Sequence, residues 1–138
     1  MDPTMTADSD VATLEFDGSS KGNPGRGGYG FLLKSGEEEI TDSGFIGDDV
    51  TNNQAEYTAL LRGLKKADNA GVSRVRVRGD SELVIKQMTG EYGVNSDNIV
   101  DLYEEACEVV DQFENVDFEH IDRGSNLIAD DLAQEAAE

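Results

Sequence analysis

Three extended segments with glycine between them open the chain, and they constrain its fold more than any other feature. Residues 11–17 (VATLEFD) and 27–34 (GGYGFLLK) are rich in apolar, β-branched and aromatic side chains, which is typical of strands. The Ser35–Gly36 pair then marks a tight turn into a third extended segment, from residue 37 to about 47. Strands joined by tight turns pair antiparallel, so the sequence predicts a three-stranded antiparallel meander.

The remainder of the chain alternates between helical and extended patterns. Apolar and small residues recur at helical spacing from residue 51 to about 70, and Gly71 follows as a stop signal. The segment SRVRVRGD alternates with the period of a strand over residues 74–78, and a fifth strand is expected at 116–121. Further helices are expected at residues 81–89, 97 to about 113, and 123–137. Ser96 is expected to cap the second of these helices. The order βββαβααβα predicts an α/β fold in which helices flank a mixed sheet.

The length of 138 residues fits one domain that buries its own core without disulfides. The single cysteine, Cys107, excludes an intramolecular disulfide and a cysteine-based zinc cluster. We expect residues 1–10 to be a flexible lead-in and residues 11–138 to form a single domain. The first ten residues lack the basic and apolar regions of a secretory signal, and no stretch has the length of a membrane span, so we expect a cytoplasmic location.

The charge of the chain is strongly negative, because 11 Lys and Arg residues face 30 Asp and Glu residues, for a net charge of −19. One interpretation is a surface that repels nucleic acids and membranes. The other is adaptation to molar salt, where the Debye length falls to ~3 Å and such repulsion is screened. The acids are dispersed within amphipathic segments rather than gathered in a tail, which favours the second interpretation and a halophilic source.

Asp17 ends the first extended segment and precedes a glycine-rich loop, a pattern with two interpretations. Such a loop can cradle a phosphate, or an acid at the end of a strand can hold a metal ion. The phosphate cradle is disfavoured, because the pattern GxxxxGK[ST] is absent and the segment GNPGRGG is not followed by a helix. The metal interpretation depends on other acids along the chain.

Further acids occupy unusual positions, each with a purely structural alternative. Glu56 falls on the apolar stripe of the long helix, where an acid is costly unless it is paired or metal-bound; the alternative is a glutamate favoured by the helix dipole. Asp80 follows the strand at 74–78, at the end where ligand sites gather in α/β sheets, or it caps the next helix. In the last helix, Asp130 and Asp131 point about 100° apart, and periodicity does not choose between them.

Together these acids predict a metal site rather than a nucleophile-based site. The only histidine is His120, and Cys107 lies within a predicted helix, so no serine, cysteine or histidine triad competes with the acids. Four carboxylates that converge on one point repel one another unless cations neutralise them. A pair of Mg²⁺-like ions ~3.5–4 Å apart, held by oxygen ligands, is the usual arrangement for phosphodiester hydrolysis.

Four segments of the chain resemble, in order and spacing, the four motifs of type 1 ribonuclease H. The resemblance covers residues 11 to about 136 and is carried by FDGSSKGNPGRGGYGF, TNNQAEYTALLRGLKKA, RVRGDSELVIKQMTGEY and HIDRGSNLIADDLA. It implies a ribonuclease H-like fold with a five-stranded mixed sheet, in which residues 11–138 form one catalytic domain. It also implies endonucleolytic cleavage of the RNA strand of RNA–DNA hybrids, with two Mg²⁺ or Mn²⁺ ions per active site when substrate is bound.

The same resemblance assigns roles to individual acids. Asp17, Glu56 and Asp80 match the family's catalytic, metal-binding acids, and the family spacing N-x-x-x-D selects Asp130 over Asp131 as the fourth. One ion is then expected to activate the attacking water and the other to stabilise the leaving 3′ oxygen. The products would carry 5′-phosphate and 3′-hydroxyl ends.

Substrate contacts also follow from the resemblance. Asparagine amides can hydrogen-bond ribose 2′-hydroxyls and base edges, and the 2′-hydroxyl is what separates RNA from DNA. One matching threonine corresponds to a residue that holds a DNA phosphate, with a helix cap as the structural alternative. The matching positions are Gly18, Asn23, Thr51, Asn52 and Asn53.

The chain departs from the family pattern in two places. Some members carry a histidine in the loop before the last helix, whereas residues 122–125 lack one, and we expect His120 in the preceding strand to have a structural role. Some members have a basic protrusion that grips the hybrid, whereas residues 91–119 contain no lysine or arginine. We therefore expect weakened affinity for the hybrid and a strong dependence on conditions. We also expect the protein to be a monomer.

Three other functions are open alternatives. A catalytically weak or inactive hybrid-binding module on the same fold is expected to have lost one or more acids, and all four are present. Another nuclease of the superfamily, such as an integrase or a Holliday junction resolvase, would lack the TNNQAE segment. A metal-independent interaction domain with a halophilic surface would bind no Mn²⁺ at a specific site.

Overall fold

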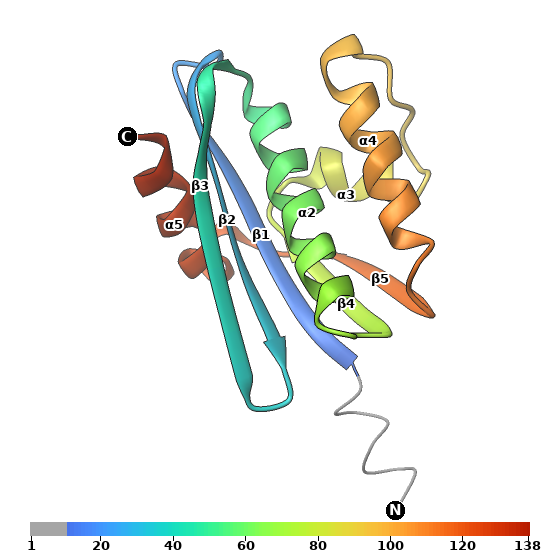
Figure 1. Cartoon of the computed structure of the whole chain (residues 1–138). Helices are drawn as coiled ribbons and strands as arrows, with labels where there is room; N and C mark the ends of the chain where they lie inside the picture. Colours follow the sequence, from blue (N-terminus) through green and yellow to red (C-terminus); the bar gives the residue numbers. More distant parts are fainter. Residues whose placement is uncertain (1–10) are drawn as a thin grey trace, which may run out of the picture.

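The three extended segments form the predicted antiparallel meander, and all three strands run further than the sequence indicated. The computed structural model describes residues 11–138, so the expected lead-in at residues 1–10 lies outside the described residues. The meander consists of β1 (Val11–Lys21), β2 (Gly25–Ser35) and β3 (Glu38–Val50) (Figure 1). Parallel pairing then adds β4 (Arg74–Gly79) beside β1 and β5 (Asn115–His120) beside β4. The result is a mixed five-stranded sheet of order β3-β2-β1-β4-β5, with β3 and β5 at its edges.

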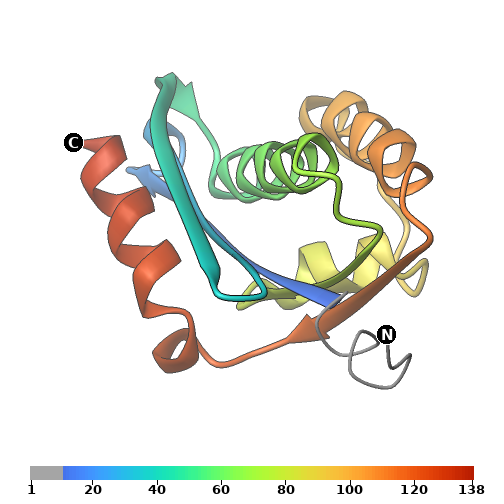
Figure 2. The same ribbon diagram turned by 60° about the horizontal axis from the view of Figure 1, so that its bottom comes forward.

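Helices follow the strands in the predicted order and cover both faces of the sheet. They are α2 (Asn52–Asn69), α3 (Glu82–Met88), α4 (Asp97–Val110) and α5 (Leu127–Ala137). Figure 2 shows α2 and α4 on one face and α5 on the other. The last helix begins later than expected, because a short 3₁₀ turn at Arg123–Ser125 precedes it. Within residues 11–138, no helix is both long and apolar enough to cross a membrane.

Capping residues account for the starts of two helices but not of a third. The Thr51 hydroxyl accepts a hydrogen bond from the Gln54 N–H at 3.1 Å, and the Gln54 side chain accepts one from the Thr51 N–H at 2.8 Å. This capping box fixes the first turn of α2. Ser81 caps α3 through its side chain alone, which accepts a hydrogen bond from the Val84 N–H. Ser96 precedes α4 as predicted, but its side chain makes no capping hydrogen bond.

The glycine-rich segment after Asp17 is a hairpin rather than the predicted loop. Strand β1 continues through Asp17 to Lys21, and these last residues pair with the start of β2. The loop prediction fails because glycine usually weakens a strand. Here glycine serves a different purpose, since a Cβ atom on Gly28 would lie only 2.5 Å from the carbonyl oxygen of Ala133 in α5. The glycines of β2 therefore let α5 pack directly on the sheet.

The main core lies between the sheet and α2. Leu14 and Phe16 of β1 and Leu60 and Leu64 of α2 are fully buried there. Another buried side chain of α2, Tyr57, donates its hydroxyl to a glutamine of α3 at 2.7 Å, which ties the two helices together. This packing fixes α2 against β1, and α2 carries one of the acids singled out in the sequence.

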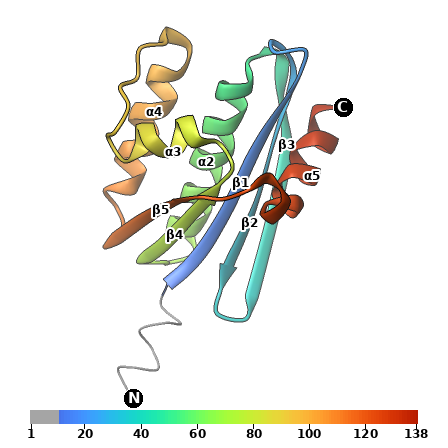
Figure 3. The ribbon, with the colours of Figure 1, turned by 180° about the vertical axis from the view of Figure 1, so that it is seen from behind.

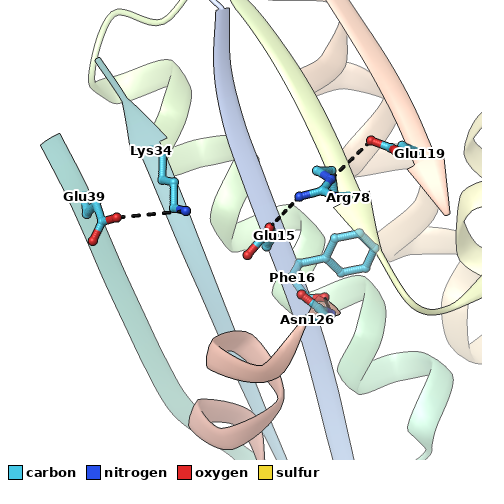
Figure 4. Close-up of polar contacts among 7 residues, drawn as sticks. All are labelled: Glu15, Phe16, Lys34, Glu39, Arg78, Glu119 and Asn126. Atoms are coloured by element: carbon cyan, nitrogen blue, oxygen red, sulfur yellow. Dashed lines mark hydrogen bonds and ion pairs between the residues drawn. The ribbon is translucent and has the colours of Figure 1, made fainter. Parts of the chain in front are cut away.

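A charged bridge crosses the sheet beside α5. This helix packs on β2, β1 and β3, while β4 and β5 lie to its side (Figure 3). Across β1, β4 and β5, the Arg78 guanidinium contacts Glu15 Oε2 at 2.8 Å and Glu119 Oε1 at 3.1 Å (Figure 4). The three residues are paired neighbours on β1, β4 and β5. The bridge therefore supports the alignment of these strands close to the end of β4.

Candidate active site

Asp17 lies within β1, at the point where the neighbouring strand β4 ends. The last pair between the two strands joins Phe16 to Gly79, and Asp80 follows β4 directly. Asp17 and Asp80 therefore meet where the parallel pairing stops. The prediction that Asp17 ends its own strand is wrong, because the hairpin prolongs β1, and it is β4 that supplies the strand end at this site.

Glu56 reaches Asp17 because α2 packs very close to β1 at Gly18. A Cβ atom on Gly18 would lie 2.3 Å from the backbone nitrogen of Glu56, so this approach requires glycine. Glu56 is 4% exposed, and its Oε2 atom has no hydrogen-bond partner among the described residues. The first turn of α2 contains no acid, so the helix-dipole alternative does not explain Glu56. A buried carboxylate without a donor is stabilised either by a bound cation or by protonation.

Asp80 completes a close group of three acids and does not cap α3. The cap is Ser81, whose hydroxyl accepts a hydrogen bond from the Val84 N–H at 3.3 Å. One carboxylate oxygen each of Asp17, Glu56 and Asp80 lies within 4.8 Å of the others. The fold thus gathers acids from a strand, a helix and a strand end that are distant in the sequence.

Of the two candidate acids in the last helix, Asp130 faces this group. Its side chain is buried, whereas Asp131 is exposed. Arg123 Nη2 donates a hydrogen bond to Asp130 Oδ1 at 3.2 Å. Gln134 Nε2 lies 3.0 Å and 3.1 Å from the two carboxylate oxygens of Asp130. Asp130 is therefore held by its own helix and by the preceding turn, on the opposite side of the cleft from α2.

The fold opposes ionisation of three of the acids and favours it in the fourth. Burial raises the pKa of Asp17 to about 8, with a further contribution from its hydrogen bond with Asp130. Burial, and then the charge of Asp17, raises the pKa of Glu56 well above its usual value. The pKa of Asp80 is raised first by burial and then by the charge of Asp130. For Asp130 itself, burial acts to raise the pKa, but hydrogen bonds, first with Asp17 and then with its two donors, outweigh burial and lower it.

These residues fit a divalent cation such as Mg²⁺ or Mn²⁺. Carboxylate oxygens are the ligands that these hard ions prefer. A cation would supply a partner for the unpaired Glu56 Oε2 and would offset the repulsion among the three close acids. The raised pKa values of the group agree with this, because burial, their largest cause, and then the charges of neighbouring acids both disfavour the ionised carboxylates.

The acids open onto a cleft of about 530 Å³. It is bounded by β1, the start of α2, the end of β4 and the turn before α5. Of the predicted substrate contacts, Gly18 and Asn52 line this cleft. Asn23 lies in the hairpin turn, where its side-chain oxygen accepts a hydrogen bond from the Asn52 N–H at 2.8 Å. The hairpin turn and the start of α2 are thereby joined at the mouth of the cleft.

The other two predicted substrate contacts, Thr51 and Asn53, do not line this cleft. Thr51 forms the capping box of α2, as its structural alternative proposed. Asn53 is half-buried in the first turn of the same helix.

Two residues that line the cleft, at the end of β5 and in the turn before α5, were not expected to contribute to it. His120, for which the sequence favoured a structural role, is exposed at the end of β5 and lines the cleft. Arg123 also lines the cleft and contacts Asp130. The sequence carried one signal for Arg123, since it is the only Lys or Arg after Lys86. Its contact with a site acid depends on the turn before α5, which sequence periodicity does not reveal.

Comparisons with known proteins agree with this arrangement. Residues 15–136 match the reverse transcriptase-like family. The chain is 41% identical over 124 residues to ribonuclease HI of Halobacterium salinarum. The aligned region covers 88% of this chain and 61% of that protein. The chain thus spans less than two thirds of this curated relative.

Solved structures extend the comparison to the fold. The N-terminal RNase H domain of Rv2228c from Mycobacterium tuberculosis, solved as a fusion with maltose binding protein, superposes with a TM-score of 0.88 at 35% identity, covering 92% of this chain and 93% of that one. LC11-RNase H1, solved in complex with an RNA/DNA hybrid, superposes with a TM-score of 0.83 at 32% identity, covering 91% and 96%. On the match over residues 15–136 and these likenesses across nearly the whole fold, the chain belongs to the type 1 ribonuclease H family.

Proposed function

We propose that this protein is an endoribonuclease that hydrolyses the RNA strand of RNA–DNA hybrids and leaves 5′-phosphate and 3′-hydroxyl ends. The observation that carries this proposal is the group of three carboxylates within 4.8 Å of one another, two of them buried and the third partly buried, open to a cleft and faced by Asp130. The name of the H. salinarum relative and the hybrid bound to LC11-RNase H1 support the same activity. On this proposal, residues 11–138 act as one catalytic domain and as a monomer.

The acids would act as metal ligands. Asp17, Glu56 and Asp80 would hold divalent cations from one side of the cleft, and Asp130 would complete the site from α5. Divalent ions bound there supply the positive charge that makes water a nucleophile and stabilises a departing 3′ oxygen. The protein's own contribution is to keep four carboxylates in place on rigid elements, with Arg123 and Gln134 orienting the fourth.

Substrate would enter along the wall formed by β1 and α2. Gly18 lines this wall, and because the backbone of α2 takes the place of its side chain, it presents only main-chain atoms to a nucleic acid strand. The Asn52 side chain lines the same wall, while its N–H is bound by Asn23. Asparagine amides at these positions are suited to ribose 2′-hydroxyls, which would direct cleavage to the RNA strand. Thr51 and Asn53 lie outside the cleft, where Thr51 would hold a phosphate of the DNA strand and the Asn53 amide would hydrogen-bond a ribose 2′-hydroxyl or a base edge.

The test is cleavage of a hybrid labelled on each strand, with Mg²⁺ or Mn²⁺, from dilute to molar KCl. We expect cleavage of the RNA strand alone, with loss of activity in Asp17→Asn. Asp131→Asn, which removes an exposed carboxylate beside Asp130, is the matched control and should cleave normally. A folded chain that binds the hybrid without cutting it in any salt would instead be a binding module. Cleavage of the DNA strand would point to another kind of nuclease.

A further inference from the structure

Asn126 occupies the N-cap position of α5 but does not cap the helix. Asparagine at such a position usually accepts a hydrogen bond from an N–H of the first turn. Here the side chain makes no capping hydrogen bond. Its Nδ2 instead donates to the carbonyl oxygen of Phe16 at 2.9 Å, across 110 residues of sequence (Figure 4). Asn126 is fully buried, so this contact lies inside the protein.

Asn126 makes two hydrogen bonds, one to the residue that precedes Asp17 and one to Asp130 itself. Its side chain holds Phe16, the residue directly before Asp17. Its own carbonyl oxygen accepts the N–H of Asp130 at 3.0 Å, which is the first hydrogen bond of α5. One residue therefore connects the strand that carries Asp17 to the helical turn that carries Asp130.

The other contacts of α5 with the sheet do not hold the end of the helix near Asp130. Arg26 of β2 donates hydrogen bonds from its Nε to the carbonyl oxygens of Ala137 and Glu138, at the opposite, C-terminal end. The close approach of the helix to Gly28 and Gly30 sets its distance from the sheet. Packing against glycine offers no side chain to stop the helix from sliding along the strand. Arg123 and Gln134 orient the Asp130 carboxylate, but both lie in the same segment as Asp130 and would move with it. The bond from Asn126 to Phe16 fixes the helix relative to β1 at the end nearest the acids.

We propose that Asn126 is a positioning residue that sets the placement of Asp130 relative to Asp17. The inference rests on the proposed function, since it assumes that both carboxylates serve one metal-binding site. Asn126 touches neither substrate nor metal in this account. It acts through the two elements that it joins, and it gives up helix capping to do so.

Asn126→Ser separates positioning from helix stability. Serine is a good N-cap, so the helix start keeps a capping residue, but its short side chain cannot reach the Phe16 carbonyl. We expect kcat for hybrid cleavage to fall about 100-fold, as for small misplacements of reacting groups, with KM changed by no more than about twofold. The affinity of the hybrid-free protein for Mn²⁺, measured by calorimetry, should fall at least about 10-fold.

Ile99→Val provides the control for lost stability. This change removes a methyl group from a buried side chain of α4, on the other face of the sheet. It should lower the unfolding midpoint while leaving kcat and Mn²⁺ affinity unchanged. If Asn126→Ser retains native kcat and Mn²⁺ affinity, or if Ile99→Val loses as much of both, the positioning role is wrong.

The calorimetry also separates this inference from the proposed function. If the native chain cuts no hybrid but Asn126→Ser still weakens Mn²⁺ binding, the nuclease proposal fails and the positioning role stands. If the native chain cuts the hybrid and Asn126→Ser matches it in both measurements, the nuclease proposal stands and the positioning role fails.

Discussion

Asp17 is an acid whose charge affects the stability of the metal-free protein. Its pKa is about 8 in the folded chain against an ordinary value of 3.8. Between these two pH values the folded state binds a proton that the unfolded state releases. The free energy of unfolding therefore falls as the pH rises from about 4 to about 8, and it is unaffected by this group outside that window.

Asp17→Asn should therefore stabilise the protein in EDTA at pH 7, because the amide needs no proton to be buried. We expect the thermal midpoint to rise by a few degrees, and the gain to vanish as the pH is lowered towards 4. Asp68→Asn makes the same chemical change at an exposed position of α2 and is the control. A midpoint at pH 7 that is lower in Asp17→Asn than in Asp68→Asn would contradict this account.

Asp130 and Asp131 offer a second comparison between neighbours. Asp130→Asn should reduce hybrid cleavage ~100-fold or more, because metal-site charge stabilisation is worth several kcal/mol. Asp131→Asn should stay within about twofold of the native rate, because its side chain is exposed and points away from the cleft. Initial rates at saturating Mn²⁺ measure both. Equal losses in the two variants would mean that the helix is rotated relative to the described arrangement.

Strand β2 and helix α5 depend on each other through glycine. At Gly30, a Cβ atom would lie 2.6 Å from Leu132 Cβ and 2.8 Å from the Ala129 carbonyl oxygen. Gly30→Ala should therefore push α5 from the sheet and lower the free energy of unfolding by ~1–3 kcal/mol. Urea unfolding measures this loss. Gly93→Ala is the matched control, since a Cβ there meets no atom within 4 Å, and a similar loss in that variant would refute the packing argument.

The sequence predicted elements and acids well, and contacts between distant segments poorly. Every predicted helix and strand is present, because each has local periodicity. Family spacing selected Asp130, which the structure places at the cleft. The roles of Arg123 and Asn126, and the extension of β1 and β2 through the glycine-rich segment, were missed for one reason. Each depends on what packs across the fold, as when Asn126 binds a carbonyl group 110 residues away instead of capping its helix.

The charge of the whole molecule dictates its response to salt. A net charge of −19 makes the compact state repel itself, and the repulsion weakens as ions screen it. We expect the unfolding midpoint and hybrid cleavage to rise together from dilute to molar KCl. Thermal unfolding and cleavage rates across a KCl series measure both. Midpoints that fall steadily with added KCl would overturn this expectation.

A charge-reduced variant shows whether screening is the cause. Asp101, Glu104 and Glu108 lie exposed on α4, a helix without a single Lys or Arg. Replacing the three by their amides should raise the midpoint in dilute buffer and flatten its dependence on KCl. An unchanged slope would attribute the salt effect to ion-specific hydration instead.

The position of β3 at the edge of the sheet bears on how molecules of this protein avoid one another. Within residues 11–138 nothing pairs with its outer side, and an open strand of 13 residues is a template for fibre growth. Its exposed side chains include Glu38, Glu39, Asp42, Asp48 and Asp49. A second copy that added edge to edge would have to dehydrate these carboxylates against a strand rich in the same acids. Molar salt screens repulsion but does not remove that dehydration, so β3 resists aggregation where net charge no longer keeps molecules apart.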